Sequence, residues 1–148
     1  MSGTNDTIEA VNLTTDIIAF RGGEVLLIER GWAPFEGHLA LPGGYVDSGE
    51  TCRTAAAREA AEETGLDLDP VRLYQVGVYD EPGRDPRGRV VSVAYAVTVP
   101  FGTRVQAGDD AASAAWVDIQ DALQRPMAFD HKQVLADAYY RYLDGALD

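Results

Sequence analysis

Three closely spaced glutamates are the residues of this sequence best placed to do chemistry. Glu59, Glu62 and Glu63 lie in the run REAAEET, within a stretch free of Gly and Pro that predicts a helix from Thr51 to Thr64. At about 100° per residue, the three carboxylates would share one face of that helix. Like charges at these spacings destabilise an isolated helix, and Arg58 relieves only part of the repulsion. A hard divalent cation is the obvious compensating charge, and a solvated acidic face is the alternative.

The loop before this helix changes the balance between the two interpretations. Gly44 to Thr51, GYVDSGET, matches the phosphate-binding P-loop pattern at every fixed position except Glu50, where that motif requires lysine. A carboxylate there would repel the phosphates that lysine attracts, so we reject an ATP-binding P-loop. The remaining interpretation is a glycine-hinged loop that brings a carboxylate and a backbone carbonyl close to the helix glutamates.

The elements that must position these groups alternate between strands and helices. Apolar runs on either side of Gly22-Gly23 predict a hairpin, and Gly65 is the expected C-cap of the glutamate helix. Asp130 is the expected N-cap of a last amphipathic helix. The predicted strands are Thr14–Phe20, Val25–Glu29, Val71–Tyr79, Val90–Val99 and Ala114–Ile119, and the predicted helices are Thr51–Thr64 and Asp130–Leu143. This order favours one layered α/β domain over residues 1–148, with residues 1–8 as a flexible tail.

Composition argues against several other classes of protein. The 148 residues contain 12 Lys and Arg against 24 Asp and Glu, a net charge of −12 that argues against binding to a nucleic-acid polymer. No run approaches the roughly 18 apolar residues of a membrane span, and residues 1–7 lack the pattern of a signal peptide. The single Cys52 fits a reducing compartment. We therefore expect a cytoplasmic protein without membrane partners.

The segment from Gly44 to Leu66 resembles the Nudix box, the signature of hydrolases that cleave nucleoside diphosphates linked to another moiety. Every fixed position of the box is filled. Ala60 is the one soft departure, since a larger aliphatic residue is more usual there. The resemblance extends to the order of strands and helices over nearly the whole chain. It implies an αβα sandwich of the α/β (α+β) class with a mixed central sheet.

The resemblance also implies a metal site and the roles of its residues. In this family the box binds Mg²⁺ or Mn²⁺, here two or three ions with substrate, through groups that correspond to the Gly44 carbonyl, Glu59, Glu62 and Glu63. Glu62 and Glu63 are the strongest candidates, and bound ions could neutralise a pyrophosphate and activate water. Arg58 would orient a metal-binding glutamate through charge-assisted hydrogen bonds. Glu50 would anchor the loop to the helix or reach the metal through water.

Three shorter stretches resemble a narrower group, the ADP-ribose pyrophosphatases. They are residues 84–95, 108–116 and 129–131. This resemblance implies a small nucleotide-sugar substrate and hydrolysis of ADP-ribose to AMP and ribose 5-phosphate. Arg87 or Arg89 could contact its phosphate or ribose, because a rigid guanidinium fork suits those oxygens. The equally weighted alternative is that these arginines pair with Asp80, Glu81 or Asp85.

A loop just before a strand supplies the candidate general base. Relatives often place there the carboxylate that activates water or completes the metal site, and Asp110 is the residue that corresponds to it. The neighbouring Gly108-Asp109 pair is also typical of a turn, which is the simpler role for Asp109.

Four aromatic side chains are candidates for contacts outside the box. Trp32 and Phe35 lie in the loop after the first hairpin, where either ring could stack on adenine or simply pack. Tyr139 and Tyr142 are interpreted as packing of the last helix. They are also candidates for a homodimer interface, since many members of the family are dimers.

Two other functions remain as alternatives. A Nudix enzyme that removes oxidised nucleoside triphosphates, of the 8-oxo-dGTP type, would share the box, and only pocket residues would distinguish it. A domain that senses ADP-ribose without hydrolysing it would share the flanking stretches, but such regulators usually lose box glutamates. Glu59, Glu62 and Glu63 are all present here, which favours the enzyme.

Overall fold

A central mixed sheet organises the protein. The computed structural model describes residues 7–108 and 111–147, and in this part of the chain seven strands form one sheet. The path of the sheet is β3-β2-β1-β6-β5, with β4 paired to β1 and β7 paired to β2. The strands are β1 (Asn12–Arg21), β2 (Glu24–Arg30), β3 (Leu39–Ala40), β4 (Gly43–Tyr45), β5 (Tyr74–Tyr79), β6 (Val90–Thr98) and β7 (Ala111–Asp118).

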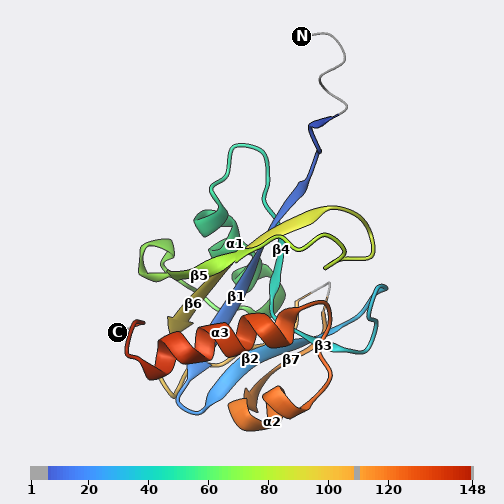
Figure 1. Cartoon of the computed structure of the whole chain (residues 1–148). Coiled ribbons are helices and arrows are strands. Elements are labelled where there is room, and N and C mark those ends of the chain that lie inside the picture. The colour runs from blue at the N-terminus through green and yellow to red at the C-terminus, as the bar shows by residue number, and fades with distance from the viewer. Residues whose placement is uncertain (1–6, 109–110, 148) are drawn as a thin grey trace.

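Helices cover both faces of this sheet (Figure 1). They are α1 (Cys52–Thr64), α2 (Ile119–Gln124) and α3 (His131–Leu143), with a short 3₁₀ helix, η2 (Pro70–Arg72). Side chains of β1 alternate between two cores. Ile17 and Ala19 pack in the core beneath α1, whereas Ile18 and Phe20 pack in the core beneath α3. This arrangement confirms the predicted αβα sandwich with a mixed central sheet.

The strand β1 lies at the centre because it is apolar on both faces. Residues 15–20 are all buried, which is typical of a strand covered on both sides. It pairs in parallel with β6 from Asn12 opposite Val90 to Phe20 opposite Thr98, and antiparallel with β2 and β4. One acid, Asp16, lies within this buried run. A charge at such a position requires partners, which the site described below supplies.

The helix α1 begins and ends as its sequence predicts. The Thr51 side chain accepts a hydrogen bond from the Thr54 backbone N–H, and Gly65 adopts a left-handed C-cap with φ 72°. The buried face consists of small side chains, which lets the helix lie close to the sheet: Ala55, Ala56, Ala57 and Ala60. Ala60 is fully buried, so a larger aliphatic residue there would press against the sheet.

Two predicted strands lose residues to short helices in the structure. The strand expected from Val71 begins only at Tyr74, because Pro70 opens the 3₁₀ helix and the Asp69 carboxylate accepts the Val71 N–H. The strand expected to reach Ile119 ends at Asp118. The Asp118 side chain caps α2, a helix that the sequence analysis missed.

The glycine-hinged loop predicted before α1 is also partly wrong. Gly43 to Tyr45 form the short strand β4, in which Gly44 pairs with Thr15 of β1. A Cβ on Gly43 would lie 2.1 Å from the Thr15 carbonyl oxygen, so only glycine permits this close pairing.

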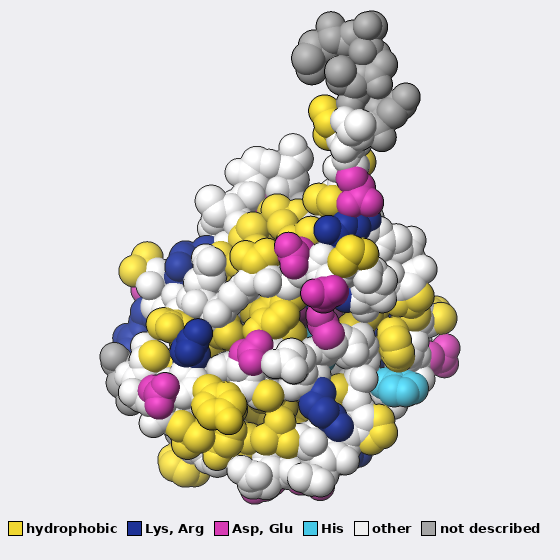
Figure 2. All heavy atoms as spheres, viewed as in Figure 1, with side chains coloured by type: hydrophobic (Ala, Val, Ile, Leu, Met, Phe, Trp, Pro, Cys, Tyr) yellow, Lys and Arg dark blue, Asp and Glu magenta, His cyan; other side chains and the backbone are white. Residues whose placement is uncertain are grey.

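The last helix packs through its aromatic side chains. The Tyr142 ring stacks on Phe20 with centroids 4.5 Å apart, and its hydroxyl donates to the Gly22 carbonyl. Tyr139 also packs against the same core. Figure 2 shows acidic side chains scattered over the α3 face rather than gathered in one patch. Within the described residues, no helix is long and apolar enough to cross a membrane.

Candidate functional site

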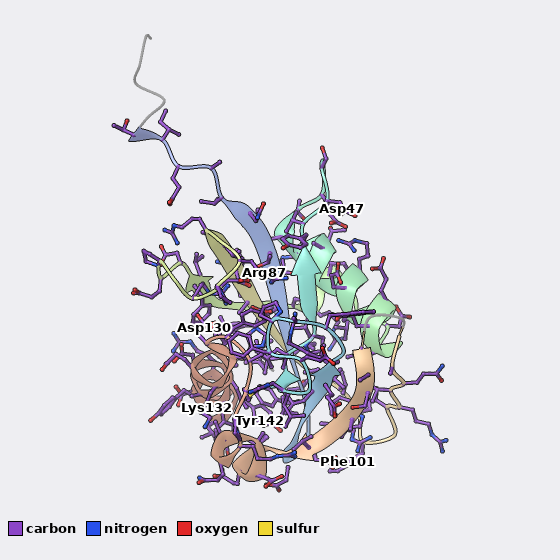
Figure 3. All side chains as sticks on the ribbon, turned by 90° about the vertical axis from the view of Figure 1, so that its right-hand side faces the viewer. Asp47, Arg87, Phe101, Asp130, Lys132 and Tyr142 are labelled. Atoms are coloured by element: carbon purple, nitrogen blue, oxygen red, sulfur yellow. The ribbon has the colours of Figure 1, made fainter. Side chains whose placement is uncertain are left out.

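A cavity of about 430 Å³ lies between α1 and the segments that precede β6 and α3. Its acidic wall consists of Gly44, Glu59 and Glu63, from β4 and α1. Its arginine wall consists of Arg30, Arg87 and Phe129, from β2, the β5–β6 loop and the segment before α3. Figure 3 shows Asp47 beyond β4 on one side and Arg87 across from it.

The acidic wall is closely packed against β4. Glu63 Oε1 accepts the Gly43 backbone N–H at 2.7 Å. A Cβ on Gly44 would lie 2.5 Å from the Glu59 carboxyl carbon, so the strand can approach this glutamate only as glycine. Burial raises the pKa of Glu59, and the hydrogen bond and charge of Arg58 oppose this only in part.

Arg58 connects the box loop to the helix. Its Nε donates to Glu50 at 2.8 Å, and its Nη1 donates to Glu59 at 2.8 Å and to Glu62 at 3.2 Å. Its Nη2 donates to the Tyr45 carbonyl at 2.9 Å. Glu50 also accepts the Asp47 N–H, and the hydrogen bond from Arg58 lowers the pKa of Glu50 to about 2. Arg58 and Glu50 therefore lie where a loop anchor and an orienting group would lie.

The donor set fits a hard cation bound jointly with a substrate. The two carboxylates on the acidic wall and the adjacent Gly44 backbone offer oxygen ligands, whereas the Glu62 side chain is 59% exposed and lies outside the cavity lining. Over residues 7–108 and 111–147, no three acidic, His or Cys side chains converge into a preformed cluster. Mg²⁺ often uses only one or two protein carboxylates and takes its other ligands from water and substrate phosphates.

A buried charge network borders the cavity, and the sequence analysis did not identify it as a network. It comprises Asp16 of β1, Ser92 of β6, Arg84 of the β5–β6 loop, and Asp130 and His131 at the start of α3. Ser92 Oγ donates to Asp16 at 2.6 Å, and Arg84 donates twice to Asp130 at 2.9 and 2.6 Å. The Arg84 side chain is only 4% exposed. The sequence signals were the acid within the apolar run of β1 and the stretches 84–95 and 129–131, which contain the other four residues.

These contacts decide the ionisation of Asp16. Burial pushes its pKa upward, but the nearby His131, Ser92 and Arg84 outweigh burial and leave the pKa lowered. Asp130 occupies the predicted N-cap position of α3, yet its side chain makes no capping hydrogen bond. The expected capping role is wrong because Arg84 binds that carboxylate instead.

His131 links the network to Leu41, in the segment that leads into β4. Its Nδ1 accepts the Leu41 backbone N–H at 3.0 Å, so this nitrogen carries no proton. Its Nε2 faces Asp16 Oδ1 at 3.3 Å and supplies the proton between them. The segment leading into β4 is thus held at Leu41 by His131 and at Gly43 by Glu63.

The other predicted site residues have different surroundings. Arg87 lines the cavity and donates to Asp85 at 3.0 and 2.7 Å. Arg89 lies outside the cavity lining and pairs with Glu9 at 2.6 Å. Trp32 lines the cavity and is 67% exposed.

Phe35 and Asp110 complete the predicted set. Phe35 packs edge-on against Phe129, with centroids 4.9 Å apart, behind the cavity surface. Asp109 and Asp110 lie outside the described residues. The described part of the loop before β7, which ends at Gly108, contacts the end of α1. There the Gly108 N–H donates to the Glu63 carbonyl at 2.7 Å.

Residues 12–138 match the NUDIX domain. The chain belongs to this family. A Nudix relative, the ADP-ribose pyrophosphatase of Methanocaldococcus jannaschii, is 41% identical over 133 residues, which cover 90% of this chain and 75% of the relative. Family and relative together support a hydrolase that acts on phosphoanhydride bonds.

Two further similarities are to a transcriptional repressor and to a NUDIX domain solved with ADP ribose. The ADPR responsive transcriptional repressor NtrR of Acinetobacter baylyi is 36% identical over 120 residues, covering 80% of this chain and 47% of the repressor. The NUDIX domain of Shewanella oneidensis NrtR, solved in complex with ADP ribose, superposes with a TM-score of 0.84 at 29% identity. That likeness covers 95% of this chain and 94% of the solved chain.

Proposed function

We propose that this Nudix protein hydrolyses ADP-ribose to AMP and ribose 5-phosphate with the help of Mg²⁺ or Mn²⁺. The observation that carries the proposal is a single cavity with box carboxylates on one wall and guanidinium groups on the other. A diphosphate held in such a cavity can meet a cation on one side and arginine on the other. The ADP-ribose pyrophosphatase relative supports this choice of substrate.

The acidic wall and the exposed glutamate beside it would hold the metal. Glu59 and Glu63, the Gly44 carbonyl and Glu62 are the proposed ligands, for two or three ions with substrate. When bound, these ions neutralise phosphoryl oxygens and make a bound water more acidic. Arg58 holds two of the carboxylates in place, and the Gly43 N–H fixes Glu63 Oε1.

Water attacks one phosphorus of the diphosphate, and the bond from that phosphorus to the bridging oxygen breaks. One phosphate leaves with the adenosine and the other with the ribose. Asp110, outside the described residues, is the proposed base that takes the proton of the attacking water. Arg87 is the proposed phosphate contact, and the exposed Trp32 ring is the proposed platform for adenine.

Substitution of one carboxylate tests the metal assignment. Glu63→Gln should lower kcat for ADP-ribose by about 100-fold or more, because it removes a proposed metal ligand. Glu62→Gln should also lower kcat, and Glu36→Gln, which alters an exposed glutamate outside the cavity, should leave it unchanged. The thermal midpoint would show that each variant folds. Full activity in both box variants would contradict the metal assignment.

A substrate panel tests the choice of ADP-ribose. We would measure phosphate-containing products from ADP-ribose, NADH, diadenosine polyphosphates, GDP-mannose and 8-oxo-dGTP in Mg²⁺. The largest kcat/KM should be that of ADP-ribose. A larger value for 8-oxo-dGTP would favour a nucleoside triphosphate pyrophosphohydrolase instead.

A second candidate function is ADP-ribose binding without hydrolysis. It is favoured by the similarity to the NrtR domain, which extends over nearly all of both chains. The same panel separates the two candidates when binding is measured in parallel by calorimetry. Tight binding of ADP-ribose with no turnover in Mg²⁺ or Mn²⁺ would establish the sensor and exclude the hydrolase.

A further inference from the structure

Two arginines on the arginine wall share one aromatic ring. The guanidinium carbon of Arg30 lies 4.9 Å from the centroid of the Phe129 ring, and that of Arg87 lies 5.5 Å from it. Both positive charges are thus within roughly 10 Å of each other, about one Debye length at 0.1 M salt. Like charges gathered on a cavity surface favour an anion between them.

The backbone around this ring adopts an uncommon conformation. Phe129 has φ 53° and its neighbour Phe35 has φ 61°, a left-handed region that bulky side chains rarely adopt. Their rings pack edge-on with centroids 4.9 Å apart. Strained backbone of this kind persists where the surrounding structure fixes it, and it is found more often at ligand-binding sites than elsewhere. Here it occurs at the residue whose ring both guanidinium groups approach.

Each guanidinium group is fixed by hydrogen bonds to an acceptor of the protein. Arg30 Nε donates to the Pro34 carbonyl at 2.7 Å. Arg87 donates through Nε and Nη2 to Asp85, a residue that is only 3% exposed. Among the described residues, the hydrogen bonds of these two arginines involve no other guanidinium nitrogen. Both terminal nitrogens of Arg30 and Nη1 of Arg87 are therefore left to bind a ligand.

The charge around Arg30 is only partly balanced. Burial lowers the pKa of Arg30 first, and the positive charge of Arg87 lowers it further, whereas Asp85 and Glu63 act in the opposite direction. Within residues 7–108 and 111–147, no carboxylate oxygen lies within 4.0 Å of an Arg30 nitrogen in an ion pair. A bound anion would relieve the repulsion between the two arginines.

We infer that Arg30 and Arg87, stacked on Phe129, form an anion clamp that binds the diphosphate group of the substrate. The inference rests on the proposed function for the identity of that substrate. Guanidinium forks match phosphate oxygens in charge and in planar geometry. The clamp holds the diphosphate from the side opposite the acidic wall, so it contributes to substrate binding rather than to metal binding. The sequence analysis did not identify Arg30, and it named Phe129 only as part of the stretch 129–131.

The kinetic test separates the clamp from the metal site. Arg30→Gln and Arg87→Gln should each raise KM for ADP-ribose about tenfold or more and change kcat by less than about threefold. Phe129→Leu should raise KM as well, because it removes the surface on which both guanidinium groups stack. Arg30→Lys should recover only part of the loss, since ammonium lacks the planar fork. Arg125→Gln, at an exposed arginine of another segment, is the matched control and should leave KM unchanged.

A binding measurement keeps the inference testable if ADP-ribose is not the substrate. Inorganic pyrophosphate is titrated into the protein by calorimetry in Mg²⁺ buffer, with thermal midpoints to show that every variant folds. Binding that Arg30→Gln and Arg87→Gln weaken about tenfold would support the clamp even without turnover of ADP-ribose. Equal binding by these variants, no binding by the unmodified protein, or unchanged KM values would each overturn it and leave only a packing role for the stacked arginines.

Discussion

The two sides of the cavity are built in different ways. The acidic wall comes from one continuous stretch, residues 44–63, in which a strand, a loop and a helix follow each other directly. The opposite side, with the arginine wall and the buried charge network, draws on five separate segments between β1 and α3. A local sequence pattern can encode the first side. The second side exists only because the fold brings distant segments together.

The net pKa shift of a buried carboxylate also differs between the two sides. Burial raises the pKa of Glu59, and the like charges of Glu62 and Asp47 add to this rise. Arg58 opposes the rise only in part. In contrast, the pKa of Asp16 is lowered, because its partners overcome its burial. The number of hydrogen-bond donors and positive charges around a buried carboxylate, rather than burial alone, determines which form is stable.

The largest expected difference follows from removing one arginine on each side. Arg84→Met leaves Asp130 and the buried Asp16 without their cation and should lower the free energy of unfolding by about 3 kcal/mol. Arg58→Met removes a guanidinium that is 25% exposed, against 4% for Arg84, so water screens its charge better and the loss should be about 1 kcal/mol. Urea denaturation of both variants measures the two losses. Equal losses would contradict the contrast in burial.

The next effect concerns the hydrogen bond that links His131 of the network to Leu41, in the segment that leads into β4. His131→Leu should lower the free energy of unfolding by about 2 kcal/mol, because the buried Leu41 N–H loses its acceptor. His131→Asn should recover about half of that, since an amide oxygen can take the place of Nδ1. His38→Leu, at an exposed histidine, is the control and should have little effect. A loss that Asn does not reduce would argue against the acceptor role.

A smaller effect is expected where the acidic wall touches β4. Gly44→Ala places a methyl group 2.5 Å from the Glu59 carboxyl carbon, so that carboxylate must move. We expect kcat to fall about tenfold, equivalent to about 1.4 kcal/mol. The matched control is Gly23→Ala, where a Cβ would meet nothing within 4 Å. Steady-state kinetics of both variants would decide, and equal kcat values would show that Glu59 is not held by this contact.

The smallest effect is a pH dependence of stability that depends on Asp16. Because the pKa of Asp16 is lowered in the folded state, its ionised form stabilises the fold at neutral pH. This contribution is lost as the pH falls below the ordinary aspartate value of 3.8 toward the lowered value. The stability difference between the unmodified protein and Asp16→Asn should therefore shrink between neutral pH and about pH 3. A constant difference in urea midpoints would contradict the ionised, network-bound state.

Sequence reasoning succeeded where the signal is local. The cap residues Thr51 and Gly65 bound α1 as expected, because capping depends on a few neighbouring backbone groups. The pairing of Arg58 with Glu62, one helical turn apart, follows from helix geometry alone. The Pro70 turn and α2 were missed because short segments carry too little periodicity to distinguish strand from helix.

By itself, the sequence determined the box: which carboxylates share a helix face, which glycines precede them and which arginine reaches them. These relations depend on spacings of a few residues, and backbone geometry fixes such spacings without help from the rest of the chain. Only the tertiary structure decided which arginines face the cavity and which donors surround Asp16. That decision requires β1 to pair with β6 and α3 to close over the sheet, contacts between residues more than 70 positions apart. Long-range convergence of this kind leaves no periodic trace in the sequence, because each segment contributes at most three of the residues.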